Sequence, residues 1–255
     1  MGKCWIGTSG WTYRSWLGPF YPENLKSGDL LIYYARRFNT VEVNSTFQRF
    51  PPVPLVKGWT RKSPDNFLFS VKAPRQFTHL KKLNVSDPEF GERFRIFVDR
   101  LSFLGGKLGP VLFQLPPKFP KDLNLLENFL KFLPSSHQFA VEFRHTDWYC
   151  DEVYEVMKKH KIATAVVIAP DMPFIPAATA SFAYFRFHGS SRWQNYHYGI
   201  DELRDAALKM HRVGRDLKNI YAYFDNDAEG SAVENARTFS DIFYAISDVD
   251  SQGEF

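Results

Sequence analysis

The chain has 255 residues, of which 44% are hydrophobic and 24% are charged, and its formal net charge is +4. This composition excludes a disordered or collagen-like protein, and the presence of two cysteines excludes a disulfide-stapled scaffold or a cysteine-rich zinc site. No run approaches the ~20 apolar residues that span a bilayer, and the N-terminal segment turns polar too soon for a signal peptide, so we expect a cytoplasmic protein with no membrane partner.

Eight short segments rich in β-branched or aromatic residues predict β-strands. In chain order they are residues 4–9, 39–45, 67–72, 110–115, 138–144, 162–168, 182–188 and 219–225.

Most of the intervening stretches have apolar residues at helical spacing. The predicted helices are residues 29–38, 88–104, 122–133, 151–159, 201–217 and 229–246. Two connections look irregular. Residues 51–64 could form a short helix at most, and residues 169–180 contain Pro170, Pro173 and Pro176, which argue against any helix.

Strands that alternate with helices imply parallel pairing through crossover connections. Eight such units in this length predict a single (β/α)₈ TIM-type barrel over residues 1–255, in which the connection between strands six and seven lacks a regular helix. The structural rival is an open, doubly wound sheet. We favour the barrel because no Gly-x-Gly-x-x-Gly turn follows the first strand.

Polar side chains alternate with apolar ones in several predicted strands, although strands buried on both faces are normally apolar throughout. Because successive side chains point to opposite faces, one face can pack on the helices while the other carries the polar groups. These groups are Glu42, Asn44, Lys72, Gln114, Glu142, Arg144, Arg186 and His188. They stand near the carboxyl ends of their strands, which converge at the catalytic face of a barrel. The pattern predicts a polar pocket there; the structural alternative is that the charges only neutralise one another.

Seven sequence blocks together resemble the YecE-like family, a domain of unknown function, over nearly the whole chain. The blocks are residues 7–22 (GTSGWTYRSWLGPFYP), 40–47 (TVEVNSTF), 71–75 (VKAPR), 112–117 (LFQLPP), 141–145 (VEFRH), 186–189 (RFHG) and 223–227 (YFDND). The resemblance implies a (β/α)₈-type barrel and no particular reaction. Gln48 and Phe77 depart from the residues common in the family, and both lie in predicted loops.

Two carboxylates and a histidine are the candidate catalytic residues. Glu42 and Glu142, on different strands, could serve as general acid and general base, and His188 could shuttle protons. A lone inward histidine can equally be a hydrogen-bonded packing residue.

Three inward cations predict the charge of the substrate. Lys72, Arg144 and Arg186 would form a clamp, since arginine binds phosphate or carboxylate through paired hydrogen bonds and lysine binds them as a point charge. Set against two inward acids, three cations leave a positive charge for a ligand. The leading hypothesis is therefore an enzyme, of the hydrolase class, acting on a small phosphorylated or carboxylated substrate.

Further residues could line the same pocket and bind substrate: Asn44, Gln114, Tyr223, Asn226, Asp227 and Trp11. Asn226 and Asp227 follow the last strand, where they can cap the next helix or hold a phosphate at its N-terminus. Trp11 follows the first strand and can either wall the mouth or cover the end of the barrel. The polar, aromatic loop of residues 190–198 can cover the pocket or pack on the surface.

Other functions stay open. A metal-dependent nuclease or a non-catalytic module for anions or nucleic acid is compatible with the mild positive charge, although no long basic run points to nucleic acid. Glu42, Glu142, His188 and Asp227 could contribute to a metal site. The sequence has no clustered histidines, so we assign no metal ligand, but oxygen-only binding of Mg²⁺ or Mn²⁺ remains open as a cofactor.

Overall fold

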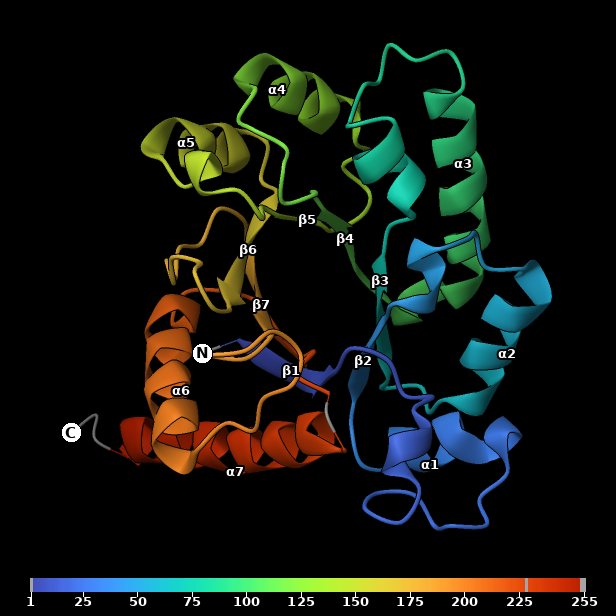
Figure 1. Ribbon diagram of the computed structural model, residues 1–255, viewed down its shortest axis with the longest axis vertical. Coiled ribbons are helices and arrows are strands. Elements are labelled where there is room, and N and C mark those ends of the chain that lie inside the picture. The colour runs from blue at the N-terminus through green and yellow to red at the C-terminus, as the bar shows by residue number, and fades with distance from the viewer. Residues whose placement is uncertain (1, 228, 253–255) are drawn as a thin grey trace.

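The computed structural model describes residues 2–227 and 229–252, and this part of the chain forms a nearly closed barrel of eight parallel strands (Figure 1). The strands are β1 (Lys3–Thr8), β2 (Thr40–Val43), β3 (Leu68–Lys72), β4 (Leu108–Gln114), β5 (Phe139–Glu142), β6 (Ala163–Ile168), β7 (Phe182–Phe187) and β8 (Asn219–Phe224). Their order around the sheet is β1-β8-β7-β6-β5-β4-β3-β2. The predicted TIM-type barrel is thus confirmed.

The barrel closes between β1 and β2 through a single parallel bridge rather than a full ladder. Ser9 pairs with Glu42, and the Gly10 N–H donates to the Glu42 carbonyl at 2.8 Å. Gly7 permits this approach, because a Cβ atom there would lie 2.3 Å from the Thr40 carbonyl oxygen. The closure brings the end of β1 beside the end of β2, where the candidate residue Glu42 stands.

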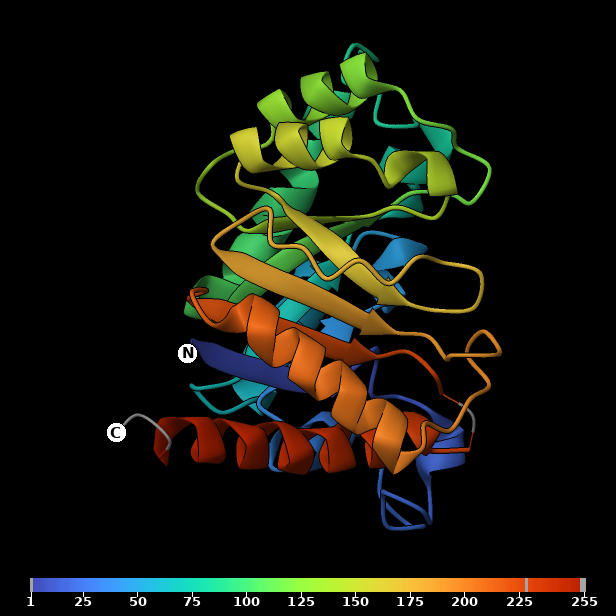
Figure 2. The same cartoon turned by 90° about the vertical axis from the view of Figure 1, so that its left-hand side faces the viewer.

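Seven α-helices surround the strands within the described residues (Figure 1). They are α1 (Leu30–Ala35), α2 (Val53–Lys62), α3 (Phe90–Leu101), α4 (Leu123–Phe132), α5 (Asp151–Lys159), α6 (Ile200–Gly214) and α7 (Ser231–Gln252). None of the helices in the described residues has the length and apolar character needed to cross a membrane. Figure 2 shows the strands running in one direction, with the end of α7 on the side where the strands begin.

The two irregular connections have different outcomes. Residues 169–180 contain no helix, as predicted from their prolines. Residues 51–64, expected to form a short helix at most, contain the ten-residue helix α2, so this connection is more regular than expected. Pro51 and Pro52 lie before the helix, Pro54 lies in its first turn, where a missing N–H does no harm, and Pro64 follows its end. The last turn carries Arg61 and Lys62 beside the helix C-terminus.

Side chains fill the barrel below its mouth, so the polar cluster rests on a packed floor. Aromatic residues from β1, β7 and β8 meet alanines of β5 and β6 in the interior. In the upper part of this floor, the Tyr223 hydroxyl lies 2.8 Å from Thr40 Oγ1 and 2.7 Å from Ser70 Oγ. Tyr223 is fully buried, and it joins β8 to β2 and β3 across the barrel.

Candidate functional site

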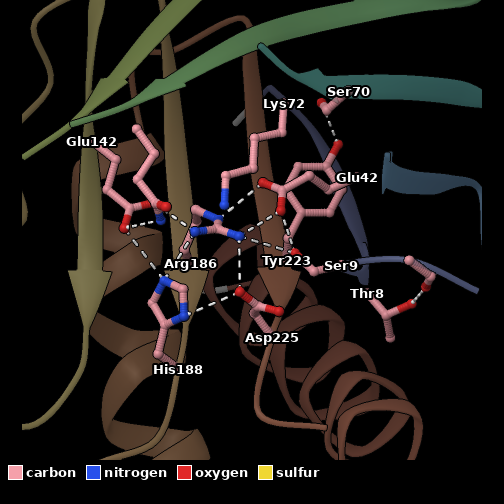
Figure 3. A network of polar contacts seen from close by, with 12 residues as sticks. Thr8, Ser9, Glu42, Ser70, Lys72, Glu142, Arg186, His188, Tyr223 and Asp225 are labelled. Carbon is pink, nitrogen blue, oxygen red and sulfur yellow. Dashed lines mark hydrogen bonds and ion pairs between the residues drawn. The ribbon is translucent and has the colours of Figure 1, made fainter. Parts of the chain in front are cut away.

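Arg186 lies at the centre of a cluster of charged side chains at the carboxyl end of the barrel (Figure 3). Its Nε and Nη2 atoms donate to the two carboxylate oxygens of Glu42 at 2.9 and 2.6 Å. Its Nη1 atom donates to Glu142 at 2.6 Å, and Nη2 also contacts Asp225 at 3.0 Å. Burial disfavours the charged guanidinium, but these three carboxylates outweigh burial and raise the pKa of Arg186 well above its ordinary value.

Glu42 is a fully buried partner of Arg186. Its Oε1 atom also accepts from the Ser9 hydroxyl, and its Oε2 atom accepts from the Tyr184 hydroxyl at 2.6 Å. Both oxygens therefore have two donors each, and the carboxylate is directed at the barrel interior. This arrangement holds Arg186 in place and leaves Glu42 poorly suited to exchange a proton with a substrate.

Glu142 links the centre of the cluster to its rim. Its Oε1 atom accepts from Gln114 Nε2 at 2.8 Å and from Arg144 Nη1 at 2.6 Å. Burial raises the pKa of this carboxyl group, yet Arg186 and Arg144 hold it well below its ordinary value. Glu142 is therefore an ionised carboxylate surrounded by donors.

His188 fills the space between the carboxylates on the β7 side. Its Nε2 atom lies 3.0 Å from Arg186 Nη1 and 3.5 Å from Glu142 Oε1. Nδ1 lies 3.2 Å from Asp225 Oδ2 without meeting the geometry of a hydrogen bond. With 1% of its surface exposed and both nitrogens directed at cluster residues, His188 is placed to orient Asp225 and Arg186.

Asp225 is the carboxylate nearest the opening of the cluster, with 10% of its side chain exposed. Its Oδ2 atom contacts Arg186 and His188, whereas its Oδ1 atom has no hydrogen-bond partner among the described residues. Burial raises the pKa of Asp225, but the Arg186 guanidinium and His188 keep it below its ordinary value. An ionised oxygen is thus available at the mouth.

Lys72 differs from the two arginines because its ammonium has no carboxylate within 4.0 Å in the described parts of the chain. The residue is 8% exposed, its Nζ atom lies 4.3 Å from the centre of the Phe47 ring, and its side chain points toward the Arg186 guanidinium (Figure 3). Burial and the charge of Arg186 lower the pKa of Lys72, against the weaker pull of the carboxylates. The ammonium is therefore desolvated without a directly bonded counter-charge.

Trp193, from the loop between β7 and α6, covers part of the rim. Its ring lies 4.0 Å from the Arg144 guanidinium carbon and 5.3 Å from the His188 ring. The Trp193 side chain is itself 38% exposed. This part of the predicted 190–198 loop thus contacts the cluster, while Tyr198 is buried beneath it and accepts from the Gly189 N–H at 2.7 Å.

The family model described as "Protein of unknown function DUF72" matches residues 5–251 of this chain. The chain belongs to the DUF72 family. The YecE-like resemblance is thereby confirmed, and the family description assigns no reaction.

Relatives and solved structures agree with this membership. The UPF0759 protein YunF of Bacillus subtilis (strain 168) is 26% identical, with 93% of this chain and 94% of that protein covered. The UPF0759 protein YecE of Escherichia coli (strain K12) is 32% identical over a match that covers 57% of this chain and 50% of that protein. The crystal structure of a DUF72 family protein from Thermotoga maritima MSB8 is 30% identical, with a TM-score of 0.84 and coverage of 95% and 99% of the two chains.

The cluster in this DUF72 barrel contains Glu42, Lys72, Gln114, Glu142, Arg144, Arg186 and His188 from the sequence candidates. Tyr223 belongs to the floor below. Asn44 and Trp11 line a neighbouring cavity of about 380 Å³, and among the described residues neither forms a hydrogen bond or ion pair with the charged groups of the cluster.

Two candidates after β8 lie away from the cluster. The Asn226 side-chain amide donates to the Tyr196 carbonyl at 2.7 Å and to Asn235 at 2.9 Å, so it ties the loop before α6 to α7. Asp227 accepts from Trp16 Nε1 at 2.6 Å. Both side chains are engaged in holding loops together.

Asp225 is the charged residue that the sequence candidates omit, and it corrects the charge count. The sequence count of three cations against two acids is wrong, because Asp225 is a third carboxylate in the cluster. The number of carboxylates then equals the number of cations, which are Lys72, Arg144 and Arg186. The signal was present, since Asp225 follows Tyr223 by two residues and so lies on the same inward face of its strand. Any argument for an anionic ligand must therefore rest on where the charges lie and not on their number.

The residues suggested for a metal do not form a metal site. Arg186 occupies the position between Glu42 and Glu142 that a cation would need, and Asp227 is bonded to Trp16. Within the described residues, no group of three or more histidine, cysteine, aspartate or glutamate side chains has the arrangement to hold a metal ion. The residues present thus do not fit Mg²⁺ or Mn²⁺ at the cluster.

Proposed function

We propose that this chain is an enzyme that binds an anionic substrate group at Lys72 in the barrel mouth and transfers a proton through Asp225. The observation that carries the proposal is the buried Lys72 ammonium, which has no carboxylate within 4.0 Å among the described residues. The other two cations of the cluster each contact a carboxylate at 2.6 Å. Lys72 is thus the one cluster cation whose nearest counter-charge could come from a ligand.

A bound anion would correct an unfavourable arrangement. Removing a charge from water has a large free-energy cost unless a partner or hydrogen bonds compensate it. A phosphate or carboxylate at Lys72 would supply that charge, and Arg144 could share it, because its guanidinium has five N–H groups and 17% of its side chain is exposed.

Asp225 supports the catalytic part of the proposal. Its low pKa keeps it ionised at neutral pH, and its Oδ1 atom is open toward the mouth, so it could accept a proton or orient a water molecule. Arg186 and His188 would act as positioning residues that fix this carboxylate. The assignment to an enzyme rests on fold-level analogy, since active sites of TIM-barrel enzymes lie at this face.

A binding experiment tests the anion site first. Isothermal titration with inorganic phosphate and with acetate should detect binding to the unmodified protein, and Lys72→Met should weaken it by about tenfold or more, as expected for a lost charged hydrogen bond. Lys57→Met, which removes the same charge from an exposed position on α2, is the matched control and should bind like the unmodified protein. Unchanged binding in Lys72→Met would overturn the anion site.

A turnover experiment separates an enzyme from a binding module. A panel of phosphomonoesters, phosphodiesters and carboxylic esters should include a substrate that is cleaved, and Asp225→Asn should lower kcat for it by about 10²-fold or more. Intact anion binding with no turnover across the panel would support the non-catalytic module instead.

A further inference from the structure

A groove beside the barrel mouth collects positive charge that the cluster does not use. It has a volume of about 610 Å³ and lies between the loops that follow β2 and β3 and the start of α3. Its lining has no acidic residue and includes three arginines, Arg49, Arg75 and Arg93, together with Gln48, Gln76 and Leu80. A groove of this size is within the ordinary range for small-molecule sites.

The charged groups of the groove are largely unpaired. Arg49 and Arg75 are exposed, and neither has a carboxylate within 4.0 Å among the described residues. Arg93 shares its charge with the exposed Glu89 at 3.3 Å, and its Nη1 atom lies 3.4 Å from Gln76 Oε1.

Gln76 supplies an independent sign that a partner is missing. Its side-chain Nε2 atom is buried and has no hydrogen-bond partner among the described residues. Buried polar groups in proteins are nearly always hydrogen-bonded, so an unsatisfied donor in a groove calls for an acceptor. An anion held by the arginines would present acceptor oxygens to it.

Two aromatic rings near Lys72, those of Phe47 and His79, are each followed in the chain by a residue that lines the groove. Phe47 lies under the Lys72 ammonium at 4.3 Å and makes an edge contact with His79, with their ring centres 5.1 Å apart. Both rings are half-buried. Burial, together with the charges of Lys72 and Arg75, lowers the pKa of His79, so the positive field of both sites reaches this ring.

We propose that this groove is a second anion subsite, and that the substrate carries two anionic groups joined by an organic segment that packs on Phe47 and His79. This inference rests on the proposed function, because it takes Lys72 as the first anion subsite. Arg49 and Arg75 would bind the second group through paired N–H donors, with Gln76 completing the contact. The substrate class is therefore a small bis-phosphate or related dianion and not a simple monophosphate.

A length series of non-hydrolysable probes tests the proposal. Linear alkane bisphosphonates of about three to eight carbons are compared with the alkylphosphonates of the same length, by isothermal titration with the full chain. At one length the bisphosphonate should bind about tenfold or more tightly than its alkylphosphonate, since the second group binds intramolecularly. Equal affinity at every length would overturn the second subsite.

Two variants assign the gain to its residues. Arg49→Gln/Arg75→Gln should abolish the gain while the alkylphosphonate affinity stays unchanged, whereas Lys72→Met should weaken both probes. Arg212→Gln/Arg215→Gln removes two charges from exposed positions at the other end of the barrel and should retain the full gain.

The two proposals fail in different ways. A gain that survives Arg49→Gln/Arg75→Gln overturns the second subsite and leaves Lys72 as an anion site. Alkylphosphonate binding that is absent, or that Lys72→Met does not change, overturns the proposed function. If bisphosphonate binding then depends only on the groove arginines, the groove is an isolated anion site, and the bridging substrate is overturned as well.

Discussion

Arg186 and Lys72 are both cations buried at the carboxyl ends of barrel strands, but their surroundings differ. The Arg186 guanidinium contacts Glu42, Glu142 and Asp225, while the Lys72 ammonium has no carboxylate within 4.0 Å in the described residues. The three carboxylates stabilise the ionised form of Arg186, whereas burial destabilises the ionised form of Lys72. One cation therefore holds the mouth together, and the other is left for a ligand.

The contrast shows why a polar barrel mouth is not by itself evidence of a binding site. A buried ion pair with good geometry can be purely structural, and removing one member leaves an uncompensated charge. Glu42 illustrates this role, since its oxygens are already occupied by Arg186, Ser9 and Tyr184. Function is better sought at groups whose partners are missing.

The largest effect should come from Arg186→Met. This change leaves three buried carboxylates without their guanidinium partner, so we expect the free energy of unfolding at pH 7 to fall by about 3–5 kcal/mol. Urea unfolding monitored by circular dichroism measures it. Because burial alone raises carboxyl pKa values, this variant should regain stability as the pH falls from 7 toward 5.

Arg144→Met is the matched comparison for that experiment. Its side chain is 17% exposed, and among the described residues its one ion pair is with Glu142, which keeps Arg186 as a second partner. We therefore expect a clearly smaller loss of stability. Equal losses in the two variants would contradict the central role of Arg186.

Sequence patterns were sufficient for the fold and for the face on which the cluster lies. Strand and helix periodicity are local, and the alternation of Glu142 and Arg144, or of Arg186 and His188, fixes which side chains point inward. Helix α2, within residues 51–64, is compatible with Pro54 because proline opposes the interior of a helix but suits its first turn, where Pro54 lies.

Pairing within the cluster could not be predicted in the same way. The contacts of Arg186 depend on the closed barrel, which sets residues of β2, β5 and β8 at hydrogen-bonding distance from β7. The groove combines Arg49, Arg75 and Arg93 from three separate segments, and no spacing in the sequence relates them. For Asp225, the two-residue separation from Tyr223 indicates that its side chain points inward, but not which residues it contacts.

An intermediate effect on stability should come from Asp225→Asn, which removes one of the three carboxylates that contact Arg186. We expect a loss of about 1–3 kcal/mol at pH 7, the range for weakening hydrogen bonds to a charged group. The folded-state pKa values of Glu142 and Asp225 lie below their ordinary values of 4.5 and 3.8, so their stabilisation is present above that range and is lost as the pH falls through the folded values.

The pH profile distinguishes this effect from simple loss of packing. Urea unfolding between pH 7 and pH 3 should show a shallower acid decline in Asp225→Asn, because one group no longer takes up a proton on unfolding. Parallel profiles for the variant and the unmodified protein would mean that Asp225 contributes no linked protonation.

The smallest effect on stability should come from Lys72→Met, even though Lys72 is as deeply buried as a core residue. Methionine keeps the packing of the side chain and removes a charge that has no directly bonded partner, so the free energy of unfolding at pH 7 should change by no more than about 1 kcal/mol, or increase. The folded-state pKa of Lys72 is lowered below 10.5. The free energy of unfolding of the unmodified protein should therefore increase relative to that of the variant as the pH rises toward 10.5. A loss in Lys72→Met comparable with that in Arg186→Met would show that Lys72 is a structural ion-pair member, and both the contrast between the two cations and the anion site would fall with it.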